Sequence, residues 1–208
     1  MKKIFVIMGK ASSGKDTLVK MLSEQLEIPM AVSFTTRPMR DGETQGVEYN
    51  FITQKEFKDQ LESGEIVEHT SYNVASGETW YYGLTKSELE KADYVIAIVN
   101  PEGLRLLKYY YEDKVVPIFI NSKPDVRIKR YLNRDIMDEE KVAECCRRFL
   151  ADKKDFERLI PNYEIFNNDE IIDAYQTLEH IVRREKAKDI LESAREGFLR
   201  DATRSLCS

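Results

Sequence analysis

The residues with the clearest chemical signature lie in the stretch GKASSGKDT, residues 9–17. Gly9 and Gly14 let the backbone curl so that successive N–H groups face a single anion, and Lys15 adds a positive charge. An apolar run, residues 4–8, precedes the stretch, and a helical pattern begins near Lys15. The unpaired N–H groups and positive dipole end of such a helix face the same anion. The spacing therefore predicts a loop that cradles the phosphates of a nucleotide, with Lys15 at the β- and γ-phosphates.

The end of this stretch departs from the common pattern of phosphate loops. That pattern has Ser or Thr directly after the lysine, where the hydroxyl contacts Mg²⁺. Here Asp16 follows the lysine and Thr17 comes one place later, so we expect Thr17 to be the metal ligand. A glycine-rich turn without a ligand is the alternative, and the flanking strand and helix argue against it. The predicted phosphate-binding residues are Gly9, Lys10, Ala11, Ser12, Ser13, Gly14, Lys15, Asp16 and Thr17.

A second stretch, SFTTRPMRDGE at residues 33–43, has the residue types of another anion site. Arg37 and Arg40 are three residues apart, and Pro38 stiffens the loop between them. Two planar guanidinium forks at this spacing suit the clamping of a phosphate. For Arg-x-x-Arg alone, a solvated basic turn would be the better interpretation.

The composition restricts the class of protein. With 208 residues, 42% of them hydrophobic, the chain can bury one good core with a small inserted lobe. The net charge of −5 argues against nucleic acid as a partner, since there is no excess basic field. The N-terminus has no signal-peptide pattern, and no apolar run reaches membrane-spanning length. We therefore expect a cytoplasmic protein without a membrane partner. A reducing compartment also fits the three cysteines, which are too few for a disulfide framework: Cys145, Cys146 and Cys207.

The order of motifs along the chain resembles one known family. GKASSGKDT, SFTTRPMRDGE, GVEYNF, GEIVEH and WYYG are similar, in the same order, to the motifs of guanylate kinases, over residues 2–182. The resemblance implies that Glu68 accepts hydrogen bonds from the guanine edge of GMP. The chemistry agrees, because a phosphate dianion needs arginine forks and tyrosine hydroxyls, and guanine N–H groups need an acceptor. By the same resemblance, the GMP phosphate is held by Ser33, Arg37, Arg40, Tyr49 and Tyr82.

The resemblance also implies a mobile lid over residues 130–148. Arg130 and Arg134 correspond to arginines that close over the transferring phosphoryl group, and Arg148, or its neighbour Arg147, would be a third. A solvated charged face is the usual explanation for such a run of charges. Further along the chain, the segment with Asn167 resembles the part of the family that lies beside adenine.

Several positions depart from the family pattern. Residues 70–80 form a longer segment than usual, and its Ser, Asn and Gly content predicts a flexible loop. Leu84 stands where Ser or Thr usually contacts guanine, and Ile98 and Asn100 stand where two aspartates usually lie. A related family, ribose 1,5-bisphosphate kinase, combines an asparagine at this place with a similar phosphate loop.

Alternating apolar runs and helical patterns predict the fold. Continuous apolar stretches at residues 94–99 and 115–120 are typical of strands buried on both faces of a parallel sheet. We expect an α/β fold with a parallel-sheet, phosphate-loop core and helices on both faces, an inserted GMP-binding lobe and a lid. The expected boundaries are a guanylate kinase-like domain over 1–186 and a helical or partly disordered tail over 187–208. Within the domain, the core comprises 1–32 and 90–186, the acceptor lobe about 33–89, and the lid 130–148.

The predicted activity is ATP-dependent transfer of a phosphoryl group to GMP or dGMP, with Mg²⁺ as the cofactor, in a monomer or homodimer. Lys15 and the lid arginines carry the catalytic role in this prediction. Three alternatives remain: a ribose 1,5-bisphosphate kinase, a nucleotide kinase of altered base choice, and a non-catalytic binding module of the same fold. Modules of the last kind tend to lose the phosphate loop, whereas Gly9, Gly14, Lys15 and Thr17 are present here.

Overall fold

Strand β1 (Lys3–Gly9) lies inside a parallel sheet of order β6-β1-β7-β8. The computed structural model describes residues 1–73, 77–133 and 138–206. In it, β6 spans Tyr94–Ile98, β7 spans Val115–Asn121 and β8 spans Tyr163–Phe166. β1 pairs in parallel with both β6 and β7, and β8 continues the sheet from β7 in the same sense. The predicted parallel sheet is therefore confirmed.

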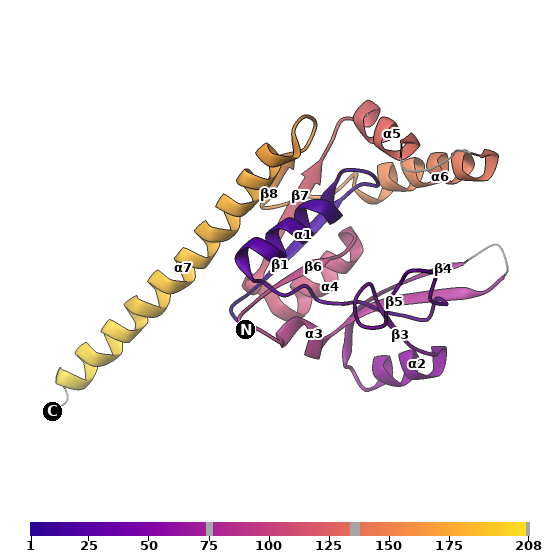
Figure 1. Cartoon of the computed structure of the whole chain (residues 1–208). Coiled ribbons are helices and arrows are strands. Elements are labelled where there is room, and N and C mark those ends of the chain that lie inside the picture. Colours follow the sequence, from indigo (N-terminus) through magenta and orange to yellow (C-terminus); the bar gives the residue numbers. More distant parts are fainter. Residues whose placement is uncertain (74–76, 134–137, 207–208) are drawn as a thin grey trace.

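Helices cover both faces of this sheet (Figure 1). Phe5 and Ile7 of β1 point into a core built with helices α1 (Lys15–Leu26) and α7 (Ile171–Leu206). Ile4, Val6 and Met8 alternate with them and point into a second core that contains Leu104 and Leu107 of helix α4 (Pro101–Tyr111). Side chains of successive strand residues point to opposite faces, so one apolar run serves both cores.

The C-terminal ends of two strands lead directly into helices at one edge of the sheet. β1 ends at Gly9, and the predicted phosphate loop connects it to α1. β6 is followed by Asn100, whose Oδ1 accepts a hydrogen bond of 2.7 Å from the N–H of Gly103. This cap, together with Pro101 at the first helical position, fixes the start of α4. Ligands of open α/β sheets bind at this edge.

A second sheet of order β3-β2-β5-β4 lies beside the first. It contains β2 (Phe34–Thr35), β3 (Asn50–Phe51), β4 (Ile66–Asn73) and β5 (Thr79–Thr85). Helix α2 (Gln54–Glu62) begins with a capping box and packs Phe57 inward, and the short helix α3 (Lys86–Glu90) returns the chain to β6. All of these elements fall within the predicted acceptor lobe.

The prediction of a flexible loop over residues 70–80 was wrong. β4 and β5 form an antiparallel hairpin whose pairing continues to Asn73 and Thr79, and within this segment residues 74–76 lie outside the described chain. Tyr72 and Tyr82 pack edge to face with ring centroids 5.7 Å apart. Cross-strand aromatic pairs of this kind stabilise a hairpin and outweigh the turn-forming Ser and Asn content.

The remaining helices lie toward the C-terminal end of the chain. A 3₁₀ turn (Glu112–Lys114) precedes β7, and α5 (Pro124–Leu132) and α6 (Glu139–Asp155) follow it. α7 continues through the predicted domain boundary at 186 and projects from the body (Figure 1). Lys3 anchors it through ion pairs with Glu185 at 2.8 Å and Asp189 at 3.0 Å. No helix in the described chain, α7 included, is both long and apolar enough to cross a membrane.

Candidate active site

The loop between β1 and α1 has the backbone geometry of a tight cradle. Gly14 has φ 86°, in the left-handed region that favours glycine. A Cβ on Gly14 would come within 2.4 Å of Nδ2 of Asn167, and one on Gly9 within 2.9 Å of the carbonyl oxygen of Ile120. Both positions therefore require glycine, one for its conformation and both for the close approach of neighbouring groups.

Two hydroxyl groups inside this loop are buried and have no hydrogen-bond partner among the described residues. They belong to Ser12 and Ser13, whose side-chain oxygens are inaccessible to solvent. A buried polar group without a partner costs about 1–3 kcal/mol, so such groups mark a site that a ligand completes. This observation supports an anion-binding role for the loop.

Lys15, Asp16 and Thr17 form the first turn of α1. The Lys15 Nζ lies 3.2 Å from Oδ2 of Asp16, whose side chain is 69% exposed. Mg²⁺ prefers oxygen ligands and usually takes one or two from protein, the rest coming from water and substrate phosphates. The Thr17 hydroxyl and the Asp16 carboxylate are oxygen donors of this kind beside the cradle. The described chain has no cluster of three His, Cys, Asp or Glu residues arranged for a metal, so the donors present fit phosphate-bound Mg²⁺ rather than a protein cage.

A buried ion pair holds the outer side of the loop. The Arg127 Nε donates a hydrogen bond of 2.7 Å to the carbonyl oxygen of Ala11, and its Nη2 pairs with Oδ2 of Asp152. The same Asp152 oxygen accepts the N–H of Ala11 at 2.9 Å, and the guanidinium lies over the ring of Phe149 at 4.2 Å. Burial lowers the pKa of Arg127, and the charge of Asp152 opposes this. Neither Arg127 nor Asp152 was predicted from the sequence to belong to the site.

Arg130 and Asn167 meet at the other side of the loop. The Arg130 Nη1 donates to the carbonyl oxygens of Asn167 at 2.9 Å and Ser13 at 3.4 Å. The Asn167 Nδ2 donates to the same Ser13 carbonyl at 2.9 Å, and Ser122 Oγ donates to the Asn167 carbonyl at 2.6 Å. These contacts bring α5, β8 and the loop together. The assignments of Arg130 to the lid and of Asn167 to ATP stay predictions.

The other predicted lid arginines lie on or before α6. Arg147 and Arg148 both donate to the carboxylate of Glu144, at 2.6 and 2.7 Å from their Nε atoms. These bonds, first of all those from Arg147, lower the pKa of Glu144 to about 2. Both arginine side chains are more than half exposed, at 62% and 51%. Arg134 lies outside the described residues.

The predicted phosphate clamp on the second sheet contains a bidentate ion pair. Nη1 and Nη2 of Arg37 donate to the two carboxylate oxygens of Glu43 at 2.9 and 2.7 Å. The guanidinium lies over the rings of Tyr49 at 5.3 Å and Phe51 at 5.5 Å. Arg37 is buried, with 5% of its surface exposed, whereas Arg40 is exposed. Glu43 was not assigned from the sequence, although it ends the motif that contains both arginines.

Two predicted phosphate ligands, Tyr49 and Tyr82, pack together beside the clamp. Tyr49 and Tyr82 pack edge to face with centroids 5.7 Å apart. Burial raises the pKa of Tyr49, and the negative charge of Asp16 adds to this shift. Ser33, the remaining predicted phosphate ligand, is half-buried immediately before β2.

Glu68 of β4 is a buried carboxylate whose side chain points at α4. It is 5% exposed, and burial raises its pKa to about 7, without any offsetting hydrogen bond from a described residue. A Cβ on Gly103 would lie 2.5 Å from its Oε1. Leu84 is its fully buried cross-strand neighbour. Asn100, at a position where the family usually has aspartate, uses its Oδ1 for the α4 cap.

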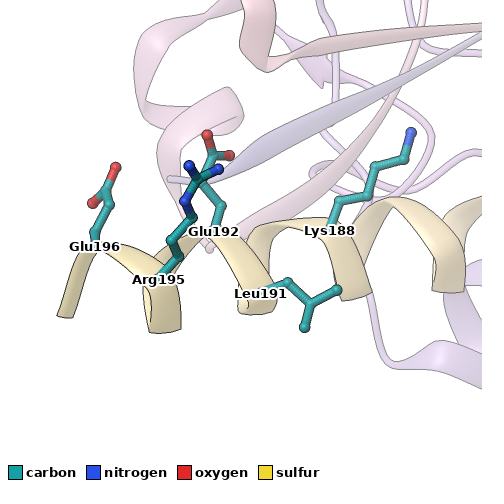
Figure 2. A pocket seen from close by; sticks show the side chains of 5 residues that line it. All are labelled: Lys188, Leu191, Glu192, Arg195 and Glu196. Atoms are coloured by element: carbon teal, nitrogen blue, oxygen red, sulfur yellow. The ribbon is translucent and has the colours of Figure 1, made fainter. Parts of the chain in front are cut away.

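The part of α7 that projects from the body has a surface hollow, but none of the residues that line it belongs to the predicted site. All of its lining side chains come from this one helix, and Figure 2 shows them along its length. They are Lys188, Leu191, Glu192, Arg195 and Glu196. The candidate site consists instead of the residues of the phosphate loop and the second sheet described above.

Comparisons with known proteins agree with this geometry. The family model described as guanylate kinase matches residues 1–185. The chain is 31% identical over 200 residues to the guanylate kinase of Chlamydia felis, covering 91% of each chain. It is 31% identical over 180 residues to that of Helicobacter pylori strain 26695, covering 81% of this chain and 84% of the relative.

A solved structure supports the same fold. The guanylate kinase from Anaplasma phagocytophilum superposes with a TM-score of 0.61, covering 88% of this chain and 85% of that chain at 24% identity. The resemblance predicted from the motifs is thus confirmed: the chain belongs to the guanylate kinase family.

Proposed function

We propose that this chain transfers the γ-phosphoryl group of ATP to GMP or dGMP, giving ADP and GDP or dGDP. The observation that carries the proposal is Glu68, a buried carboxylate without a hydrogen-bond partner among the described residues, in the same chain as an intact phosphate loop and a buried Arg37. Guanine presents an N1–H and an exocyclic amine, two donors that a carboxylate can accept together. The guanylate kinases of C. felis and H. pylori support the same activity.

The reaction requires positioning and charge neutralisation rather than covalent catalysis. A phosphate oxygen of GMP attacks the γ-phosphorus, the bond to the β–γ bridging oxygen breaks, and ADP leaves with that oxygen. The attacking oxygen is already anionic near neutral pH, so no general base has to remove a proton. Bound Mg²⁺ would supply charge neutralisation on the β- and γ-phosphates, with Thr17 as its protein ligand.

The residues of this chain have separate roles in binding ATP, in binding GMP and in stabilising the transferring phosphoryl group. The loop residues 9–17 bind the ATP phosphates, Lys15 neutralises charge on the transferring group, and Asn167 lies on the adenine side. Arg37 and Arg40 hold the GMP phosphate together with Ser33, Tyr49 and Tyr82, and Glu68 reads the base. Arg130, Arg134 and Arg148 act from a lid.

The proposal also includes the cellular location, the oligomeric state and the domain boundaries of the enzyme. The enzyme works in the cytoplasm as a monomer or homodimer, independently of nucleic acid. Residues 33–89 form the acceptor lobe, 130–148 form the lid, and the core comprises 1–32 and 90–186. The second sheet within 33–89 supports the lobe, since its strands pair only with one another in the described chain.

A coupled assay of ADP release tests this function. Purified protein receives ATP and Mg²⁺ with GMP, dGMP, AMP, UMP or ribose 1,5-bisphosphate, and Lys15→Ala serves as the inactive control. We expect the highest kcat/KM with GMP or dGMP. Preference for ribose 1,5-bisphosphate would favour the related kinase, to which Asn100 and Asp16 also point. A preference for AMP or UMP would show altered base choice, and release without any acceptor would contradict the proposal.

A further inference from the structure

Glu43 determines which N–H groups of Arg37 remain available to a ligand. A guanidinium has five N–H donors in one plane. Nη1 of Arg37 donates to the carbonyl oxygen of Pro38 at 2.8 Å and to Oε2 of Glu43 at 2.9 Å, and Nη2 donates to Oε1 of Glu43 at 2.7 Å. The N–H of Nε and the second N–H of Nη2 lie together on the remaining edge. That edge is a bidentate donor of the kind that binds phosphate.

The surroundings of Arg37 match such a ligand. The hydrogen bond from Arg37 to Glu43 raises the pKa of Arg37, and the hydroxyl of Tyr82 lies close enough to add to this. The Tyr49 ring lies under the guanidinium at 5.3 Å. Only 4% of the Arg37 side chain is exposed, so the surrounding groups restrict it to its present rotamer. Its orientation is therefore set by the groups that it contacts, and Glu43 contacts it twice.

The same carboxylate also fixes the backbone of the second arginine. Oε2 of Glu43 accepts the N–H of Arg40 at 2.8 Å, and the N–H of Glu43 donates to the Arg40 carbonyl at 3.2 Å. Gly42, with φ 83°, permits the turn that brings these groups together. One side chain thus links the guanidinium of Arg37 to the main chain of Arg40.

We propose that Glu43 is a positioning residue of the acceptor-phosphate site: by occupying one edge of Arg37 and holding the turn at Arg40, it presents the Nε and Nη2 edge of Arg37, together with the nearby Tyr82 hydroxyl, to the phosphate of GMP. This inference rests on the proposed function. The bonds from Arg37, and then from Arg40, lower the pKa of Glu43 to about 2. The carboxylate therefore stays ionised at every pH at which the enzyme is assayed.

The position of Glu43 relative to the GMP phosphate determines how its removal would change the affinity for GMP. If Glu43 occupied the place of the substrate phosphate, GMP would have to displace it, and removal of its charge would strengthen GMP binding. If Glu43 positions Arg37, removal of its charge weakens GMP binding. The sign of the change in affinity therefore separates the two arrangements.

The test is a calorimetric measurement of Kd for GMP and for guanosine, which lacks the phosphate, with wild type, Glu43→Gln and Glu48→Gln. Glu48 is the matched control, because its carboxylate accepts the N–H of Thr44 at 2.7 Å in the same loop and is exposed. We expect Glu43→Gln to weaken GMP binding by about ten- to a hundredfold. Guanosine binding, the KM for ATP and both affinities of Glu48→Gln should change by no more than about twofold.

The outcomes separate this inference from the proposed function. Wild type that fails to bind GMP overturns both. Wild type that binds GMP, with Glu43→Gln equal to it or tighter, overturns only the role of Glu43. Equal losses for GMP and guanosine also overturn it, because they indicate a general disturbance of the loop, which a lowered Tm of the variant would show independently.

Discussion

The carboxylate of Glu68 lies against Gly103, so closely that a Cβ at position 103 would come within 2.5 Å of Oε1 and within 3.0 Å of Cγ and Cδ. The two residues belong to β4 and to the first turn of α4, and Asn100 fixes that turn by capping the Gly103 N–H. The proposed base-reading group therefore packs against helix α4, which covers one face of the parallel sheet. The position of this helix depends on a side chain that stands where the family usually has aspartate.

Gly103→Ala should displace the Glu68 carboxylate without unfolding the protein. Alanine favours a helix by about 1 kcal/mol over glycine, which offsets part of the cost of moving the flexible carboxylate. We expect kcat/KM for GMP to fall by about tenfold or more, since a hydrogen bond to a charged group contributes about 1.5–3 kcal/mol. The KM for ATP should stay the same. Gly197→Ala is the control, because a Cβ there meets no atom within 4 Å. Equal GMP kinetics in both variants would show that Gly103 does not position Glu68.

Binding of guanosine should become stronger as the pH rises toward neutrality. Only the ionised carboxylate of Glu68 accepts both guanine donors, and its pKa in the free protein is about 7. Below that pH, each unit should weaken binding about tenfold, because one proton must be released. Guanosine is the better ligand for this measurement, since the phosphate of GMP itself titrates near pH 6. A flat profile between pH 5 and 8 in calorimetric titrations would contradict the assignment.

The stability of the unliganded protein should change with pH in the opposite direction. The pKa of Glu68 is about 7 in the folded protein and 4.5 for a free glutamate side chain, so the folded state binds more protons between these values. The contribution of Glu68 to the free energy of unfolding is therefore full below pH 4.5 and is lost as the pH rises to about 7. Urea unfolding of wild type and Glu68→Gln across this range checks it. The free energy of unfolding of wild type, relative to that of Glu68→Gln, should be higher at pH 5 than at pH 8. A relative free energy that stays constant over this range would show that the pKa of Glu68 is not raised.

Arg37→Ala and Arg40→Ala should both weaken acceptor binding but should differ in their effect on stability. Loss of either cation from a phosphate site costs on the order of 2–5 kcal/mol, seen as a raised KM for GMP with ATP binding much less affected. Arg37 is buried and paired with Glu43, whereas Arg40 is exposed, so only Arg37→Ala should lower the Tm by several degrees. Loss of ATP affinity equal to the loss for GMP would place the arginines on the donor side.

Arg127→Ala should damage the donor side through the phosphate loop. It removes the hydrogen bond to the Ala11 carbonyl and leaves Asp152 without its buried partner. Breaking such a pair costs about 3–5 kcal/mol, so we expect a clear loss of stability and a raised KM for ATP. Arg183→Ala is the control, since Arg183 pairs with Glu179 on the surface of α7, where such pairs contribute about 0.3–0.5 kcal/mol. If ATP kinetics respond equally in both variants, Arg127 does not support the loop.

Local patterns along the chain were sufficient to predict the parallel sheet and the helices that cover it. The apolar run before Gly9 and the helical spacing after Lys15 predict β1 and α1 correctly, because both depend on near neighbours. Residues 70–80 could not be predicted in this way. Their pairing is stabilised by the cross-strand contact of Tyr72 with Tyr82, which the Ser, Asn and Gly content of the segment does not reveal.

The candidate site shows the same division. The spacing of Gly9, Gly14 and Lys15 predicts phosphate binding by itself, whereas Arg37 and Glu68 were assigned through the resemblance of their motifs to the guanylate kinase family. The residues that contact these groups from distant parts of the sequence were not predicted. Arg127 and Asp152 meet across 25 residues and reach Ala11 across more than a hundred, and Gly103 of helix α4 lies against Glu68, 35 residues earlier in the chain. Only Glu43 stood inside a motif, where its pairing with Arg37 could have been suggested by charge alone.

The ratio of kcat/KM for GMP to kcat/KM for AMP, measured with wild type and Glu68→Gln, tests the central claim most directly. AMP has no N1–H and leaves the buried carboxylate facing an acceptor, and sites built on such hydrogen bonds discriminate strongly. We expect wild type to prefer GMP despite Leu84, Ile98 and Asn100, and Glu68→Gln to narrow the ratio by about one to two decades. A ratio that does not move, or a wild type that prefers AMP, would contradict the claim that Glu68 reads guanine.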